Sequence, residues 1–185
     1  MRFSLSYFTS RRVLLGIIFL IGTINPFTEI EEFRLEPLFM ASHYLLFIAG
    51  FLLAGRMRMP GSFIGLGIFL VVLWHIPFFY ALAAAYPTFR ILNDLSLLTA
   101  GIFSASSSRN FPAIIRLLLF VAWMGADSVL SVVLIVGWPP YSSQVYPFSP
   151  FAATQELPTG LTMFGIMTAI FVYVILTLLK SIFKI

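Results

Sequence analysis

Residues 72–89, VLWHIPFFYALAAAYPTF, place a tryptophan, a histidine and a proline inside a long apolar run. The whole run covers residues 62–86 and exceeds the roughly 20 residues that a helix needs to cross a bilayer. Only Pro87 separates it from the next apolar run, so the two runs are predicted to form antiparallel neighbouring helices. An ionisable side chain is costly in hydrocarbon, which makes His75 a candidate functional residue.

The composition of the 185 residues is that of an integral membrane protein. Hydrophobic residues make up 60% of the chain and charged residues only 10%, and the mean hydropathy is +1.01. One water-soluble core of this size could not bury so much apolar surface, so lipid is expected to solvate much of it. The chain has no cysteine, which excludes disulfides and thiolate metal ligands.

Turn residues and charges divide the chain into six apolar segments. Because backbone polar groups in hydrocarbon must bond internally, each segment is predicted to be a helix. The predicted fold is an all-α integral membrane protein, a bundle of about six transmembrane helices that forms one polytopic domain over residues 1–185. The expected helices cover residues 12–27, 36–55, 62–86, 88–106, 111–138 and 158–182.

The distribution of charges predicts the orientation of this bundle. Lys and Arg residues near helix ends favour the cytoplasmic side. If both termini are cytoplasmic, Arg34 and Arg90 are the basic residues that fall outside, together with the glutamates. We therefore predict a multi-pass protein of the plasma membrane, with the lipid bilayer as a partner. The net charge of +4 follows from this orientation and implies no nucleic-acid partner.

Residues 139–157, which follow the fifth predicted helix, are expected to form a lid. They carry no charge before Glu156 and are rich in Pro, Tyr and Phe, a composition unlike that of a solvated flexible linker. In the predicted orientation this lid lies on the outer face.

A few polar side chains interrupt the predicted helices at similar depths. At a rise of 1.5 Å per residue, His43 and Asp94 lie roughly 10 Å, and His75 and Asp127 about 16 Å, from the outer ends of their helices. Four different helices thus direct an ionisable group into the outer half of the membrane. The polar and sulfur-containing residues in question are His43, His75, Asn93, Asp94 and Asp127, with Met40, Met124 and Met163.

Structural roles for the same residues remain open. Asp94 follows Arg90 by four residues and could form an intrahelical ion pair with it, or it could join the histidines. His43 and His75 could hydrogen-bond between helices without binding a ligand. Asp127 could be satisfied by neighbouring serines, and single methionines are commonly packing residues.

Three stretches carry a family resemblance. The stretch WHIPFFYALAAAYP, residues 74–87, resembles the Trp-His-x-Pro-x-x-Tyr-x-x-Ala motif of the CtaG-type cytochrome oxidase assembly factors. FMASHYLLF, residues 39–47, is similar to the His-Met-x-Gln-His-Leu-Leu-Leu segment of that family. TQELPTGLTMF, residues 154–164, is similar to its Asp-Gln-Gln-Leu-Ala-Gly-Leu-x-Met-Trp segment. The order of the stretches agrees with the family, and we interpret the chain as a divergent member of archaeal type.

The resemblance implies a site, but this sequence lacks some of the residues that the family has there. It carries over the residues Met40, His43, Trp74, His75, Pro77, Gly160 and Met163. Phe39, Arg90 and Asp94 stand where the family has further histidines, and six helices are predicted where seven are usual. The metal ligands expected from the resemblance and the depths together are His43, His75, Asp94 and Met40, with Asp127 and Met163 as additional candidates.

The function expected from these residues is a non-enzymatic accessory or assembly role for a haem-copper terminal oxidase, with copper held at the outer face. Imidazole and thioether donors suit copper, and a carboxylate makes the site harder. One alternative is a stable structural subunit of a respiratory complex with a lipid- or quinone-lined cavity. Another is a haem b carrier with His43 and His75 as axial ligands. No nucleophile and base pair is recognisable, so no enzymatic turnover is expected.

Overall fold

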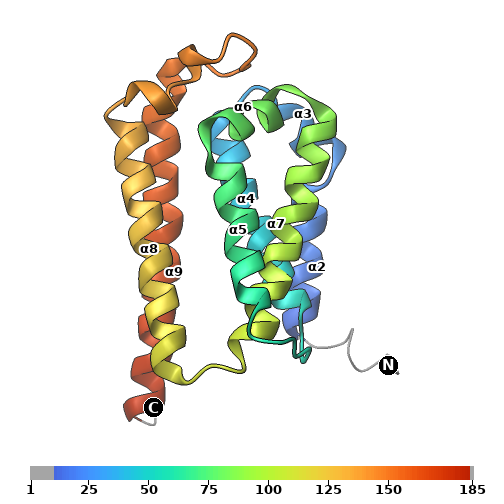
Figure 1. The fold of residues 1–185 in the computed structure, drawn as a ribbon, viewed down its shortest axis with the longest axis vertical. Coiled ribbons are helices and arrows are strands. Elements are labelled where there is room, and N and C mark those ends of the chain that lie inside the picture. Colours follow the sequence, from blue (N-terminus) through green and yellow to red (C-terminus); the bar gives the residue numbers. More distant parts are fainter. Residues whose placement is uncertain (1–10, 184–185) are drawn as a thin grey trace.

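The computed structural model describes residues 11–183, and every regular element in this part of the chain is helical. The prediction of an all-helical chain is therefore confirmed for these residues (Figure 1). The helices are α2 (Arg11–Thr23), α3 (Pro26–Glu32), α4 (Glu36–Leu53), α5 (Phe63–His75), α6 (Pro77–Ala85), α7 (Pro87–Ser108), α8 (Ala113–Ile135) and α9 (Glu156–Phe183). Three single turns of 3-10 helix, η1 (Pro139–Tyr141), η2 (Ser143–Val145) and η3 (Ala153–Gln155), lie between α8 and α9.

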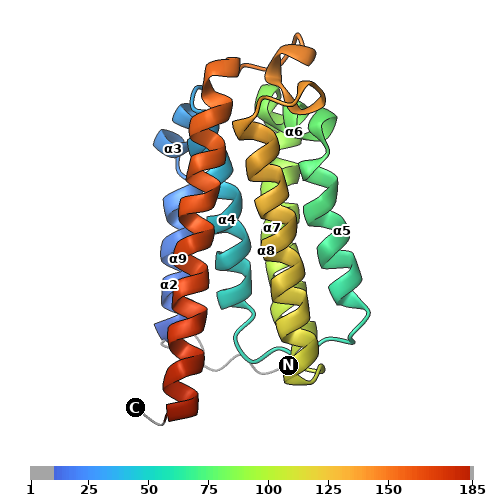
Figure 2. The same ribbon diagram turned by 90° about the vertical axis from the view of Figure 1, so that its left-hand side faces the viewer.

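The long helices run side by side along one axis (Figures 1 and 2). Helix α7 packs against α4, α5 and α6, and α2 packs against α4. Helices α8 and α9 form an antiparallel pair that contacts the others mainly through α4 and α9. We call the end with α3, α6 and the η turns the upper end, and the end with the α4–α5 and α7–α8 connections the lower end. The predicted pairing of the segments on either side of Pro87 is confirmed by the α5 and α6 contacts with α7.

Two glycines allow α4 and α7 to approach closely. A Cβ atom on Gly50 would overlap the carbonyl of Leu98, and one on Gly101 would overlap the carbonyl of Phe47. Only glycine brings the two backbones so near each other. These contacts fix the position of α7 relative to α4, on which the polar side chains described below depend.

The first predicted helix, residues 12–27, is wrong at its end. Helix α2 stops at Thr23, and the following acidic segment, which we expected to be a connection, forms α3. The Asn25 side chain accepts hydrogen bonds from the backbone N–H groups of Phe27 and Thr28, and Pro26 occupies the first turn. This capping starts a new helix that is bent by 57° from α2. As a result the α3 glutamates lie on an ordered helix.

The third predicted helix, residues 62–86, is broken in the middle. Pro77 has no N–H group to donate to the carbonyl of Leu73, and Ile76 there adopts an extended conformation with ψ 128°. Helices α5 and α6 therefore meet at an angle of 73° immediately after His75. Pro77 thus makes two helices of the one that the apolar run predicted.

Three unbent helical stretches are long and apolar enough to span a membrane, namely Glu36–Leu53, Ala113–Ile135 and Ala153–Thr177. The number rises to five if each bent pair, α2 with α3 and α5 with α6, is one span. Helix α7, which corresponds to the fourth of the six predicted spans, is not among these candidates. Its buried face carries Arg90, Asn93 and Asp94 near the upper end and Ser106 and Ser107 near the lower end, which lowers its hydropathy. Helix α7 packs against α4, α5 and α6, so part of its surface contacts protein.

The segment between α8 and α9 covers the upper end as an ordered lid (Figure 1). Phe151 is buried against Phe39 and Tyr80, and Phe148 contacts the rings of Phe78 and Tyr86. Gln155 then fastens the lid to the turn before α4. Its side-chain oxygen accepts from the Glu36 N–H at 2.6 Å, and its amide nitrogen donates to the Arg34 carbonyl at 2.9 Å.

Candidate functional site

Buried polar groups are concentrated in the upper half of the bundle, below the lid. They come from α3, α4, α5, α6 and α7. The two residues of one ion pair are 58 positions apart in the sequence. The ion pair, the paired histidines and a small cavity are three adjoining parts of this polar core.

The ion pair joins Arg90 of α7 to Glu32 of α3. The Arg90 side chain is 1% exposed, and one of its terminal nitrogens lies 2.9 Å from Glu32 Oε2. Ser42 donates to the other carboxylate oxygen of Glu32. The guanidinium carbon lies 3.9 Å from the ring centre of Phe33 and 4.3 Å from that of Phe39, in range for cation–π attraction. Both charges are thus paired, hydrogen-bonded and enclosed by aromatic rings.

Arg90 also closes the end of α6. Its side chain donates to the carbonyls of Ala83 at 3.3 Å and Ala84 at 3.4 Å. In a continuing helix the Ala83 carbonyl would accept from residue 87, but Pro87 has no N–H group. Arg90 supplies the missing donors and so holds the short bent helix in place.

The two histidines lie together in the bundle, as expected from their depths. The ring centres of His43 on α4 and His75 on α5 are 5.8 Å apart, and His43 also lies 4.4 Å from the ring centre of Phe39. The Asn93 amide nitrogen is 2.5 Å from His43 Nε2. Because an amide NH₂ group donates, His43 Nε2 accepts and its lone pair is already used.

His75 presents a free acceptor. Its Nδ1 lies 2.7 Å from the Val71 carbonyl, so Nδ1 carries the hydrogen and Nε2 of the neutral ring keeps its lone pair. A backbone carbonyl that holds the other ring nitrogen is the usual arrangement of a ligating histidine. His75 is therefore better prepared than His43 to bind an ion.

A small cavity of about 20 Å³ lies between His75, α4, α6, α8 and the lid. A site of ~10–15 Å³ is enough for one water molecule, so this cavity has room for a single small species. Glu36 and the Tyr80 hydroxyl are buried next to each other, and the phenol is placed to donate to the carboxylate. Both residues line the cavity, together with Met40 and His75. A carboxylate, a phenol, a thioether and an imidazole thus surround one space.

Asp94 forms neither of the two arrangements that the sequence left open. The expected Arg90–Asp94 ion pair is wrong, because the Arg90 side chain turns toward α3 and α6 and pairs with Glu32. Asp94 also does not contact a histidine directly. Its Oδ1 accepts from the Asn93 amide at 3.4 Å, and that amide in turn contacts His43.

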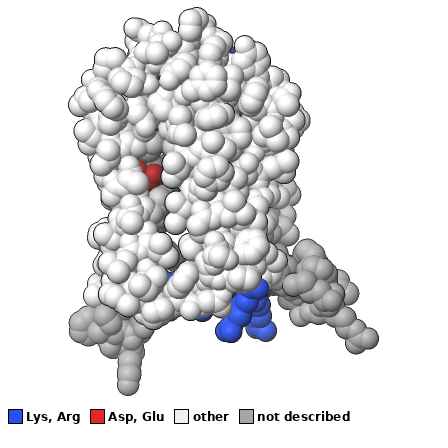
Figure 3. Space-filling view, in the orientation of Figure 1, with Lys and Arg blue, Asp and Glu red and all other residues white. Residues whose placement is uncertain are grey.

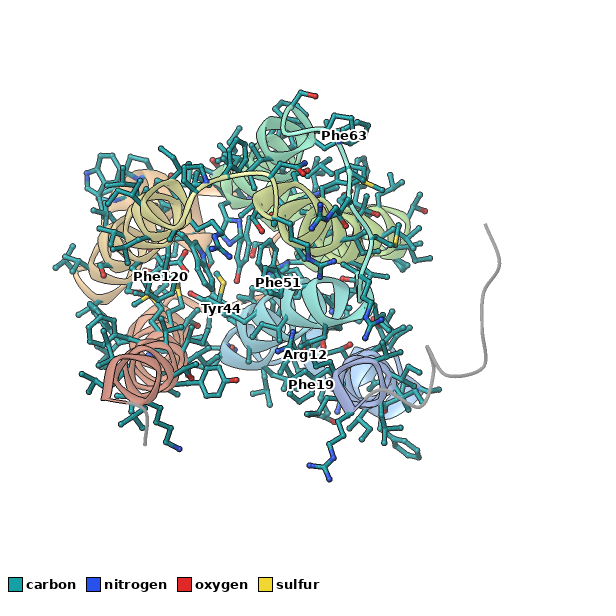
Figure 4. All side chains as sticks on the ribbon, turned by 90° about the horizontal axis from the view of Figure 1, so that it is seen from below. Arg12, Phe19, Tyr44, Phe51, Phe63 and Phe120 are labelled. Carbon is teal, nitrogen blue, oxygen red and sulfur yellow. The ribbon has the colours of Figure 1, made fainter. Side chains whose placement is uncertain are left out.

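The remaining candidate ligands lie outside the cavity lining. Asp127 is buried on α8 beside Tyr44 and Trp123. The neighbouring serines do not satisfy the Asp127 carboxylate, since Ser131 donates to the Asp127 backbone carbonyl; Tyr44 and Trp123 are the side chains placed to donate to it. Tyr44 lies between α4 and the α8–α9 pair (Figure 4). Met163 is fully buried in an apolar cluster with Met40 and Met167.

Within residues 11–183 no three His, Asp or Glu side chains are grouped closely enough to hold a metal ion. At the cavity, the Met40 sulfur and the Tyr80 hydroxyl are further donors beside His75 and Glu36. The resemblance did not indicate Glu36 as a site residue, and it included Tyr80 only as the tyrosine of the Trp-His-x-Pro-x-x-Tyr-x-x-Ala motif, without a role. A helical spacing of four and seven places Glu36 on the same face as Met40 and His43, and that signal was available in the sequence.

The fold and this site define an all-helical protein with three to five candidate membrane-spanning helices and a polar core near one end. The chain belongs to the family described as Protein of unknown function (DUF1404), which matches residues 14–181. Searches of curated proteins and of solved structures gave no match.

Proposed function

We propose that the chain is a multi-pass protein of the plasma membrane with about six passes and cytoplasmic termini. The strongest support is the exposure of apolar helix faces. Only 17% of the apolar window of α8 and 22% of that of α9 is buried within the protein, so most of these surfaces need lipid or another protein. Helix α7 would cross as the central helix, packed against α4, α5 and α6.

Within this membrane protein we assign the cavity at His75 to one copper ion, held near the outer face. The observation that carries the proposal is the free Nε2 of His75 in a cavity that it shares with Met40 and Glu36. Imidazole, thioether and carboxylate donors together suit copper better than calcium or magnesium. His43, 5.8 Å away between ring centres, could bind the same ion only after releasing the Asn93 amide. Asp94 would act on the site through Asn93 and not as a ligand.

The role that follows is a non-enzymatic accessory or assembly function for a haem-copper terminal oxidase. The resemblance of residues 39–47, 74–87 and 154–164 to CtaG-type factors supports the link to the oxidase. A copper ion under a closed lid can be stored and transferred, whereas a catalytic copper site needs access for a substrate. The cavity of about 20 Å³ gives more support to a single ion than to haem b or a quinone.

A stable structural subunit of a respiratory complex is the second candidate. It is favoured by the apolar face of α8, where Val121, Val129 and Val136 are among the exposed side chains. Such a face could pack against a neighbouring subunit as well as against lipid. Co-purification with oxidase subunits at constant stoichiometry, without copper in the chain, would support this candidate.

Copper titration of the purified protein in nanodiscs tests the proposal. We expect one bound copper ion in the unchanged chain and none in His75→Ala. Met40→Leu should weaken copper binding by at least about tenfold, which is the lower end of the loss in affinity that substitutions around a metal site cause. Met163→Leu is the matched control, because it makes the same exchange in the same apolar cluster outside the cavity.

The two histidine variants separate binding from packing. Loss of copper in His75→Ala at unchanged thermal stability would support a ligand role. Unchanged copper content in both His75→Ala and His43→Ala, with reduced stability, would assign both rings to structure. That result would refute the copper site and favour the structural subunit.

A further inference from the structure

An arginine-lined pocket lies at the lower end, opposite the polar core. It has a volume of about 470 Å³ and is lined by Arg12 of α2, Arg109 after α7, and Gly55, Arg56 and Arg58 of the α4–α5 connection. In the space-filling view, arginine or lysine side chains gather along the lower edge while the rest of that face is almost free of charge (Figure 3). Figure 4 looks onto this end and labels Arg12.

The connection that carries two of these arginines is held in a fixed conformation. Arg109 donates to the carbonyl of Met57 at 2.8 Å and to that of Gly55. The Asn110 amide donates to the Met59 carbonyl at 2.5 Å, and the Met59 N–H to Ser106 at 3.4 Å. Gly55 has a φ of 51°, which glycine adopts without strain and which ends α4. Arg56 and Arg58 are thus exposed side chains on a backbone that α7 holds in place.

The charges of this pocket are not neutralised by acidic residues. The sequence contains seven Asp and Glu residues, and none lies in the lower connections. Both ion pairs found in residues 11–183, Arg34–Glu31 and Arg90–Glu32, belong to the upper end. Arg109 donates to uncharged carbonyls, so its charge also remains available. Four positive charges around one pocket attract an anion with several oxygen atoms.

Apolar surface adjoins the same pocket. Leu15 lies one turn above Arg12 on α2 and is 46% exposed. An anion from solution, such as free phosphate, would leave the apolar surface beside the pocket uncovered. A phospholipid has both parts, a phosphate for the arginines and acyl chains for the helix surface.

We propose that this arginine pocket binds the phosphate headgroup of an anionic phospholipid, with an acyl chain along α2. The inference rests on the membrane placement proposed above and is independent of the copper site. Arg56 and Arg58 would contact the headgroup, and Arg109 positions the connection that carries them. Bound lipid would join α2, α4 and the start of the α7–α8 connection at the lower end.

Lipid binding by the detergent-purified chain, measured by native mass spectrometry, tests this site. The probes are phosphatidylglycerol, phosphatidylcholine and the soluble headgroup glycerol 3-phosphate. We expect preferential binding of phosphatidylglycerol. Each arginine near an anionic headgroup contributes about fivefold in affinity, so the double variant Arg56→Gln/Arg58→Gln should bind about 25-fold more weakly.

The matched control is the double variant Arg11→Gln/Arg116→Gln. It removes the same net charge from exposed lower-end residues that do not line the pocket, and it should bind like the unchanged chain. Equal binding of both lipids, equal loss in both double variants, or displacement of the lipid by glycerol 3-phosphate would each overturn the proposal. Copper binding by Arg56→Gln/Arg58→Gln should be unchanged. If the unchanged chain were found in the soluble fraction of cells and not with the membranes, that result would instead refute the membrane placement.

Discussion

Replacing Arg90 by methionine should destabilise the protein more than any other change of a single charged residue at its upper end. Methionine retains much of the apolar length of the side chain but none of its donors. The change leaves the Glu32 carboxylate buried without its partner and removes the donors to the carbonyls of Ala83 and Ala84. The contacts of the guanidinium with the rings of Phe33 and Phe39 are also lost.

The expected magnitude follows from the burial of both charges. Their side chains are 2% and 3% exposed, and removing one partner of a buried ion pair costs about 3–5 kcal/mol. For a chain of this length, about 1 kcal/mol shifts the unfolding midpoint by roughly 2–4 °C, so the midpoint should fall by about 6–20 °C. The double variant Arg90→Met/Glu32→Leu should recover part of this loss, because it leaves no unpaired charge.

Thermal unfolding in nanodiscs at a fixed scan rate, followed by circular dichroism, measures these shifts. Arg34→Met is the matched control. Arg34 forms the other ion pair, with Glu31 at 3.5 Å, but the two side chains are 70% and 49% exposed. Such a pair contributes at most about 1 kcal/mol, so its loss should change the midpoint by only a few degrees. If Arg90→Met and Arg34→Met had equal effects, or if the double variant were no better than Arg90→Met, the ion pair would not hold this end together.

Two further predictions concern packing and orientation. Gly101→Ala should destabilise the bundle by more than about 2 kcal/mol because the new methyl group meets the backbone of α4. Gly125→Ala, with no atom near its Cβ position, should be neutral or slightly stabilising. The thermal unfolding midpoints of the two variants measure this difference. In this cysteine-free chain, Gln144→Cys in the lid should react with an impermeant thiol reagent only from outside intact cells, and Arg58→Cys only in inverted vesicles. Labelling of Gln144→Cys from the cytoplasmic side alone would reverse the proposed topology.

The long helices were predictable from the sequence, whereas the breaks in two of them were only partly so. Apolar runs fix the approximate limits of α4, α8 and α9, since lipid and core both select apolar residues over the whole length. The break at Ile76 follows from the missing N–H group of Pro77, but its angle of 73° depends on how Arg90 and the lid hold α6. The start of α3 depended on a capping asparagine, Asn25, which lies inside the first predicted helix.

The candidate site was predictable as far as depth along a helix determines it. Equal depth on neighbouring helices brought His43 and His75 together, and helical spacing placed Met40 beside them. The partner of Arg90 could not be found in this way, because Glu32 lies 58 residues earlier on a helix that was not predicted. The spacing of four between Arg90 and Asp94 favoured a local ion pair, yet the carbonyls left free by Pro87 draw the guanidinium the other way.

The attachment of the lid by Gln155 determines the order in which the protein can be completed during synthesis. This one side chain bonds the backbone on both sides of the turn before α4, across 119 residues of sequence to Glu36. A ribosome must therefore make most of the chain before the earliest helices acquire this fastening. Until then the lid residues that line the cavity, from Tyr141 to Ser149, are present without the attachment to the turn before α4. Whatever occupies the cavity can enter during this interval without any later opening of the lid.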